Sequence, residues 1–207
     1  MYTPKFNEIH DRAILLEAMR AYSFAILFGP LDETIEAVPH KATHLPLVVK
    51  DEGPYGLVEG HFAKANPHWQ ALANRETLVV FPGPHSYVSP SLYAEQLSVP
   101  TWNYIAIHAY GKLELIEDDE AKQALLSSLI EANEPAYAEQ WQGLPDGYRR
   151  TLLGGIVGFR IPITHLEGKF KLSQNRPEAD RAAIQNAQAN GAEDERALAG
   201  WMKRLIG

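Results

Sequence analysis

The sequence predicts an α+β protein whose antiparallel strands form a closed or partly open barrel. Short runs rich in β-forming residues follow one another, with Gly, Pro and Asp between them, as is typical of strands joined by tight turns. Helical patterns do not alternate with these strands, so nothing supports a doubly wound parallel sheet. A Rossmann nucleotide site is therefore not expected, and "GGIVGF" at 154–159 is not a dinucleotide fingerprint.

The first half of the chain contains most of the short strands. Apolar residues at helical spacing predict a helix over 8–22, with Asn7 or Asp11 as its N-cap. A second, short helix is predicted over 66–74, with Asn66 as its cap and Pro67 in its first turn. Strands are predicted at 23–29, 34–39, 44–50, 55–61 and 76–83, and a Pro-rich loop through Pro90 follows the last of them.

The second half begins with the longest strand-like run, 101–117, in which apolar and polar residues alternate and Gly111 predicts a bulge or bend. The segment "EGKFKLSQNRPEADR" at 167–181 is interpreted as a loop that leads into a helix. The other predicted elements are helices at 118–134, near 147–153, at 178–190 and at 193–206, and a strand at 155–163.

Length and composition predict one soluble domain. The 207 residues suffice for one domain, 1–207, with a barrel to about residue 165 and a C-terminal loop and helices over 166–207. The absence of cysteine excludes disulfides, thiolate metal sites and a cysteine nucleophile. The N-terminus lacks the order of a signal peptide, and the apolar runs are too short to span a bilayer. We therefore expect a cytoplasmic protein without membrane contact.

The net charge of −7, from 26 acidic and 19 basic residues, disfavours DNA as the main ligand. Phosphate neutralisation by a basic surplus supplies most non-specific DNA affinity. Direct DNA binding would need a local basic patch.

Two segments bear polar groups suited to an anion or a cofactor. In "PHKATHLP" (39–46), His40 and His44 lie too far apart along a strand for a metal site, so no metal is expected. In "EGHFAKANPHW" (59–69), Lys64 lies beside the predicted start of a helix, which favours phosphate binding. The alternative for this segment is an ordinary capped helix with a surface lysine.

Two further segments could line a cofactor pocket. Tyr87, Tyr93, Trp102 and Tyr104 could form the wall for a flat ring system, or instead belong to a core or a dimer surface. The 167–181 segment offers several donors for phosphate or ring acceptors, or it is a solvated linker. No serine lies in a nucleophile elbow, and no carboxylate pair stands out, so redox chemistry would require a bound cofactor.

Together these segments resemble the PaiB-type family of FMN-binding transcriptional regulators. The resemblance covers nearly the whole chain except the last helix. The matching phrases are "MYTPKF", "ATHLPLV", "GHFAKANPHW", "GPHSYVSPSLY", "VPTWNYIAIHAYGKLEL", "IVGFRI" and "LEGKFKLSQNRPEADR". Phe170 stands where tryptophan is common in the family, and Lys64 where arginine is common.

The resemblance implies an FMN-binding split barrel of six antiparallel strands with peripheral and C-terminal helices. It also implies a homodimer with FMN at the subunit interface. By this analogy the phosphate side comprises His61, Ala63, Lys64 and Asn66. Thr43, His44 and Leu45 would run along the isoalloxazine edge. The remaining flavin contacts, from the partner or closing the pocket, would be Trp102, Asn103, Lys171, Gln174 and Asn175.

Three functions remain open, because split barrels host several activities. The first is a flavin-dependent oxidoreductase or flavin reductase, with NAD(P)H as a possible donor. The second is an FMN-responsive negative transcriptional regulator. The third is a haem-binding protein in which His108 or His165 serves as a ligand. The net charge favours the first over direct DNA regulation.

Overall fold

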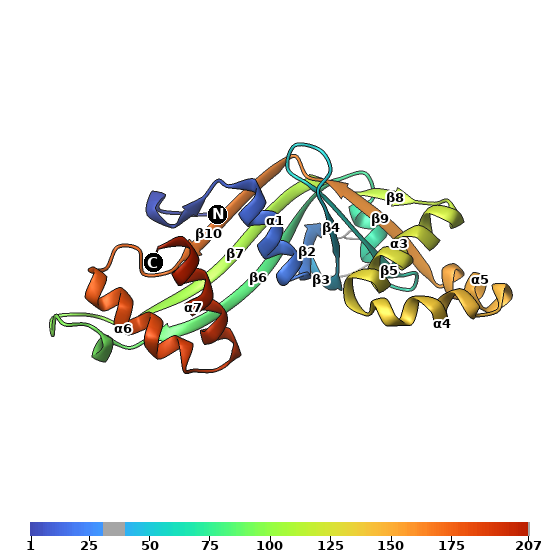
Figure 1. Cartoon of the computed structure of the whole chain (residues 1–207). Helices are drawn as coiled ribbons and strands as arrows, with labels where there is room; N and C mark the ends of the chain where they lie inside the picture. Colours follow the sequence, from blue (N-terminus) through green and yellow to red (C-terminus); the bar gives the residue numbers. More distant parts are fainter. Residues whose placement is uncertain (31–39, 207) are drawn as a thin grey trace. The chain divides into compact units, whose positions relative to one another are not determined.

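The computed structural model describes residues 1–30 and 40–206, so the strand expected at 34–39 lies outside the described residues. The chain forms two compact units (Figure 1). Unit 1 comprises Met1–Asp11, Pro82–Ile107 and Glu167–Gly207, and unit 2 comprises Arg12–Phe81 and His108–Leu166. Strands β6 (Glu76–Val88), β7 (Thr101–Lys112) and β10 (His165–Lys171) have residues in both units.

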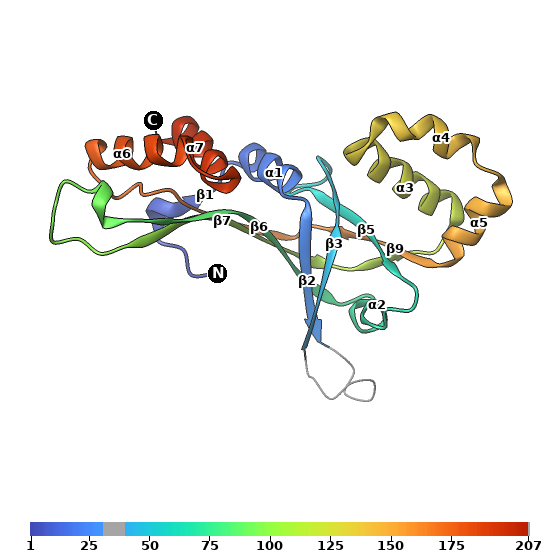
Figure 2. The same cartoon turned by 90° about the horizontal axis from the view of Figure 1, so that it is seen from below.

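Unit 1 contains strands in the order β1-β10-β7-β6, with β1 (Glu8–Ile9) antiparallel to β10. Helices α6 (Glu178–Ala189) and α7 (Glu193–Leu205) lie side by side and cover one face of these strands (Figure 2). Phe170 packs edge-on against Trp201 of α7, with 5.2 Å between ring centroids. Two short 3-10 helices complete the unit, η1 (Lys5–Asn7) and η2 (Pro90–Leu92).

Unit 2 contains two groups of strands. In one, β2 (Phe24–Pro30) lies between β6 and β3 (His40–Pro46). The other is a sheet of β4 (Val48–Lys50), β5 (Leu57–Ala63), β9 (Ile156–Pro162) and β8 (Glu114–Ile116), in that order. Its helical elements are α1 (Arg12–Ala21), α2 (His68–Leu72), α3 (Asp119–Asn133), η3 (Pro135–Tyr137), α4 (Ala138–Gly143) and α5 (Asp146–Gly154).

The core of unit 2 follows from strand alternation. Phe62 of β5 is fully buried, and its ring lies 5.0 Å from that of Phe159 on β9. Side chains of neighbouring strand residues point to opposite faces, so His61 and Ala63 lie on the other face of β5. Gly60 fits tightly on the core side, since a Cβ there would meet Leu47 at 2.6 Å.

Most predicted elements are present, with corrected boundaries. The capping prediction for α3 is confirmed, because the Asp118 carboxylate accepts a 2.8 Å hydrogen bond from the Ala121 amide. The helix predicted from residue 8 begins at Arg12, because residues 8–9 pair with β10 as a strand. The helix predicted over 66–74 shortens to α2.

Three other predictions about local structure were wrong in part. The Pro-rich segment after residue 83 continues β6 to Val88. The run 101–117 divides at Leu113, whose amide and carbonyl bond to Arg75 and Asn74. The 167–181 segment is not a loop throughout, because its first residues form β10. Strand pairing over long sequence separations supplied these hydrogen bonds, and local propensity could not indicate it.

No helix in the described part of the chain is long and apolar enough to cross a membrane.

Replacing Gly111 with alanine is expected to destabilise the fold by about 1–3 kcal/mol through overpacking. A Cβ at this position of β7 would lie 2.3 Å from the backbone oxygen of Pro162. Gly147→Ala is the matched control, because a Cβ there meets nothing within 4 Å. Urea denaturation followed by circular dichroism measures both variants. Equal unfolding midpoints for the two would contradict the close approach of β7 to Pro162.

Candidate functional site

Three polar side chains of unit 2 form a connected cluster, which we call the Thr43 cluster: Thr43, Asn66 and His68. The Thr43 hydroxyl lies 2.8 Å from His68 Nδ1, and Asn66 Nδ2 donates to the same hydroxyl at 3.4 Å. The His68 amide donates to Asn66 Oδ1 at 3.1 Å. His68 is fully buried and edge-on to the Phe62 ring. The cluster therefore fixes β3 against the start of α2.

Lys64 lies in the turn between β5 and α2. Its amide donates to the Gly155 carbonyl at 2.9 Å, and its own carbonyl accepts a 3.1 Å hydrogen bond from Trp69 Nε1. The side chain is exposed, and no described carboxylate forms an ion pair with its ammonium group. The backbone at Lys64 is thus fixed on both sides, while the charge remains available to an anion.

The N-cap of α2 is Pro67 and not the predicted Asn66, although the Asn66 side chain accepts a hydrogen bond from the first helical amide, that of His68. With only five residues, α2 is too short to offer a helix-terminal anion site. The phosphate-binding potential of this region therefore resides in the Lys64 ammonium and the polar side chains of the Thr43 cluster.

His61 does not join the Thr43 cluster. Phe62 contacts His68, so the neighbouring His61 side chain lies on the opposite face of β5. Its Nδ1 is buried and has no hydrogen-bond partner in the described chain. Burial lowers the pKa of His61, which favours a neutral ring at pH 7. Ala63 lies on the same face as His61 and is exposed.

The three predicted residues of β3 likewise point in two directions. Thr43 pairs with Leu27 and Leu45 with Ala25, both of which are buried. His44 faces the other way, with its ring 6.2 Å from that of the exposed Phe24. Side chains from this strand therefore cannot all contact one surface of a ligand.

In unit 1 the turn after β10 is held by a buried hydrogen bond. Ser173 Oγ donates to Asn103 Oδ1 at 2.8 Å, and Asn103 Nδ2 lies 3.8 Å from Met202 Sδ. Asn103 is fully buried, so its side chain supports the turn after β10. Ser173 has a φ of 64°, a conformation that costs a non-glycine residue roughly 1–2 kcal/mol. The hydrogen bond offsets that cost.

Gln174 closes the same turn with both of its polar atoms. Its Oε1 accepts from the Leu172 amide at 2.8 Å, and its Nε2 donates to the Phe170 carbonyl. Asn175 is exposed at the tip of the turn. The segment predicted to offer donors is therefore a turn that is closed by its own hydrogen bonds, and the side chain of Asn175 is exposed.

A pocket of about 330 Å³, which we call the cationic pocket, lies within unit 1. Lys169, Lys171 and Arg176 contribute three positive charges to its lining. The full lining is Tyr2, Pro4, Phe6, Asn7, Val99, Pro100, Thr101, Tyr104, Lys169, Lys171, Ser173, Asn175 and Arg176. Lys169 and Lys171 share one face of β10, while the intervening Phe170 enters the core.

The two lysines are held differently. Lys169 Nζ donates to the Tyr2 carbonyl at 3.0 Å and lies 5.2 Å from the centre of the Tyr104 ring. Lys171 Nζ donates to Thr101 Oγ1 and to the Trp102 carbonyl. Burial, and then repulsion from Lys169 and Arg176, lower the pKa of Lys171.

The predicted aromatic wall divides between two places. Tyr104 lines the cationic pocket, and Tyr93 lies under the Arg176 guanidinium at 3.9 Å. Trp102 is 51% exposed and packs against His85 and Tyr87, with centroids 6.0 Å away in each case. Only part of the predicted aromatic set therefore faces the cationic pocket.

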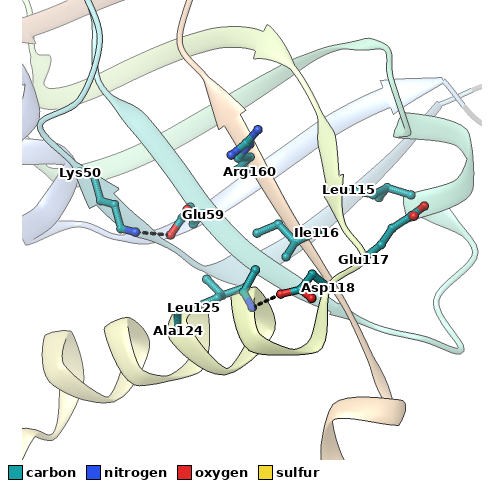
Figure 3. A pocket seen from close by; sticks show the side chains of 10 residues that line it. Lys50, Glu59, Leu115, Ile116, Glu117, Asp118, Ala124, Leu125 and Arg160 are labelled. Atoms are coloured by element: carbon teal, nitrogen blue, oxygen red, sulfur yellow. Dashed lines mark hydrogen bonds and ion pairs between the residues drawn. The ribbon is translucent and has the colours of Figure 1, made fainter.

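Unit 2 has a pocket of about 340 Å³ between α3 and the four-stranded sheet (Figure 3). Its charges largely compensate one another. Lys50 pairs with Glu59 at 2.7 Å, and Arg160 pairs with Glu114 at 2.8 Å. Asp118 caps α3. This arrangement leaves no strong preference for a charged ligand.

Another pocket in unit 2, of about 630 Å³, is mainly apolar. It is lined by Phe28, Gly29, His40, Leu78, Val80 and His108.

Sequence reasoning missed His68 and Tyr2, and it left Lys169 out of the predicted flavin contacts. The two-residue spacing of Lys169 and Lys171 would have placed both on one face if residues 167–171 had been assigned to a strand. No local signal indicated that Tyr2, far away in the sequence, covers Lys169.

Comparison with solved structures defines the class of protein. The fold matches the flavocytochrome Anf3 of Azotobacter vinelandii with a TM-score of 0.62 at 16% identity, over 87% of this chain and 78% of that one. It also matches the conserved hypothetical protein Rv2991 of Mycobacterium tuberculosis with a TM-score of 0.60 at 12% identity, over 86% and 95% of the two chains. The fold is the predicted α+β split β-barrel.

Residues 1–165 match the family model described as "Putative FMN-binding domain", and the chain belongs to this PaiB-type family. It is 37% identical to "Protease synthase and sporulation protein PAI 2" of Bacillus subtilis (strain 168), over 87% of this chain and 85% of the relative. It is 32% identical to the uncharacterized protein AN0679 of Emericella nidulans, over 70% of this chain and 73% of that protein.

The cofactor of this domain is FMN. The residues of unit 2 fit its phosphate group, because the exposed Lys64, which has no acidic partner in the described chain, lies two residues before Asn66 of the polar Thr43 cluster. The split-barrel and FMN predictions are both confirmed.

Lys171 is expected to titrate below the ordinary lysine value of 10.5. Burial and two neighbouring cations disfavour its charged form, so it loses its proton earlier as pH rises. Amine labelling of the ligand-free protein across a pH series, followed by peptide mass spectrometry, gives the midpoint for this residue. A midpoint at or above 10.5 would show that the three cations do not repel one another as the structure indicates.

Proposed function

We propose that this protein is an FMN-dependent oxidoreductase of the flavin-reductase type, acting as a homodimer with FMN at the subunit interface. The observation that carries the proposal is the exposed Lys64, whose ammonium has no acidic partner among the described residues and which lies two residues before Asn66 of the Thr43 cluster. The chain belongs to an FMN-binding family. NAD(P)H is the proposed electron donor.

We assign the phosphate side of FMN to Lys64, Thr43 and Asn66. The ammonium supplies charge, and the hydroxyl and amide supply hydrogen bonds. His68 positions Thr43 and Asn66 through its hydrogen bonds with both residues. His61 and Ala63 border this side from the opposite face of β5, and His44 and Leu45 border the ring edge from the two faces of β3.

Residues of unit 1 complete the proposed flavin contacts in the dimer. Lys171 and Asn175 present donors, and Trp102 presents a half-exposed ring. Asn103 and Gln174 act as positioning residues, because their polar atoms hold the turn at Ser173. Their removal would displace the donors rather than delete a contact with FMN.

When bound, FMN supplies hydride transfer, and the protein supplies binding, orientation and exclusion of water. The sequence shows no nucleophile elbow that would favour hydrolysis instead. The reaction class therefore depends on the cofactor.

An exposed apolar surface supports the proposed subunit contact. Phe24 and Phe28 of β2 are 60% and 38% exposed, and His44 lies beside Phe24 on the same face. Large exposed aromatic side chains on a sheet face are typical of protein interfaces.

A second candidate, haem binding, is favoured by the apolar pocket that His40 and His108 line. Imidazole in an apolar pocket is a common haem environment. Titration with haemin would give a Soret shift that His108→Ala abolishes. An unchanged haemin spectrum would exclude this candidate.

Lys64→Ala is expected to weaken FMN binding by about 10- to 100-fold, since a hydrogen bond to a charged group contributes roughly 1.5–3 kcal/mol. Flavin fluorescence quenching gives the dissociation constant. Lys112→Ala is the matched control, because Lys112 is also an exposed lysine of unit 2. Equal losses in both variants, or none in either, would remove Lys64 from the phosphate site.

Anaerobic NAD(P)H is expected to bleach the absorbance of the FMN-bound protein, because hydride transfer reduces the isoalloxazine ring. Gel-shift titration with DNA at several salt concentrations tests the regulator alternative on the same preparation. Tight, sequence-specific DNA binding without bleaching would replace the oxidoreductase with an FMN-responsive regulator. Weak binding at low salt alone would reflect only local charge.

A further inference from the structure

The cationic pocket has an uncompensated charge that the phosphate side of FMN does not explain. Lys169, Lys171 and Arg176 line it, while none of its other lining residues is acidic. The proposed phosphate side uses Lys64 of unit 2 instead. Three cations around one small cavity repel one another unless an anion enters.

The need for an anion in the cationic pocket is clearest at Lys169. The residue is only 9% exposed, and among the described residues its ammonium group donates to one oxygen, the Tyr2 carbonyl. The rings of Tyr2 and Tyr104 lie 5.7 and 5.2 Å from Nζ. Ring faces stabilise a cation but do not neutralise it. A carboxylate in the pocket would supply the missing counter-charge.

The walls of the pocket indicate what is attached to that carboxylate. Tyr2, Phe6 and Tyr104 provide aromatic surface, and the volume of about 330 Å³ suits a single small ring compound. Aromatic rings pack favourably against one another in offset or edge-on contacts.

Asn7 adds a requirement for a hydrogen-bond donor. This residue is 2% exposed and lines the pocket. Its Oδ1 is buried and has no partner in the described chain. A buried acceptor without a donor is costly, and a hydroxyl or N–H group on the ligand ring would satisfy it.

We propose that the cationic pocket binds a small aromatic carboxylate whose ring carries a hydrogen-bond donor. The carboxylate pairs with Lys169 and Arg176, and the donor bonds to Asn7, while Lys171 remains among the proposed flavin contacts. The inference deepens the proposed function by naming the chemical class of a second, anionic ligand. Binding of this ligand does not depend on the proposed function, whereas its role as a reactant does.

The test is calorimetric titration of FMN-saturated protein with 4-hydroxybenzoate, with benzamide as the uncharged probe and inorganic phosphate as the non-aromatic anion. We expect 4-hydroxybenzoate to bind at least tenfold more tightly than either comparison compound. Lys169→Gln and Arg176→Gln should each weaken its binding at least tenfold and leave FMN affinity unchanged. Lys203→Gln, an exposed lysine of α7, is the matched control and should bind as the wild type does.

Circular dichroism separates loss of binding from loss of folding in the buried Lys169 variant, and Arg176→Gln repeats the test at a less buried position. Unchanged affinity in both folded variants would overturn the proposal. So would equal binding of phosphate, or displacement of 4-hydroxybenzoate by FMN. Binding as expected without NAD(P)H bleaching would sustain the pocket and reject only the oxidoreductase.

Discussion

The hydrogen bond between Ser173 and Asn103 is the constraint on which the polar architecture of unit 1 depends. It connects the turn after β10 to β7 in a fully buried place, and the Met202 contact extends it to α7. Because Ser173 adopts a left-handed backbone conformation, the chain reverses sharply there. Lys171 before the turn and Arg176 after it consequently line one cavity.

Unit 2 uses polar groups in a different way. There the backbone around Lys64 is tied to Gly155 and Trp69, while Thr43, Asn66 and His68 form hydrogen bonds with one another. Rigid support under an exposed cation favours anion binding, because little side-chain or loop order must be gained when the anion arrives. In unit 1 the cations themselves are partly buried, so a ligand there would relieve an existing electrostatic cost.

Much of the fold could be predicted from local pattern, because caps and helical periodicity are encoded within a few residues, as at α3 with Asp118. The resemblance in the segments around Thr43 and Lys64 supplied FMN and the split barrel. The parts of the fold that could not be predicted depend on contacts between residues far apart in the sequence. Two lysines in 167–171 suggested a loop, whereas pairing with β1 and cover from Tyr2 make the segment a buried strand. The burial of His68 likewise follows from packing rather than from its neighbours in sequence.

The division of the chain into units has a consequence for how such a protein can evolve. The chain passes between the units after Asp11, Phe81, Ile107 and Leu166, and the last three of these points lie within β6, within β7 and within β10. Neither unit is a continuous segment, so recombination at one site cannot exchange either as a module. New binding properties must instead arise by substitution, and strands β6, β7 and β10 contribute residues to both units.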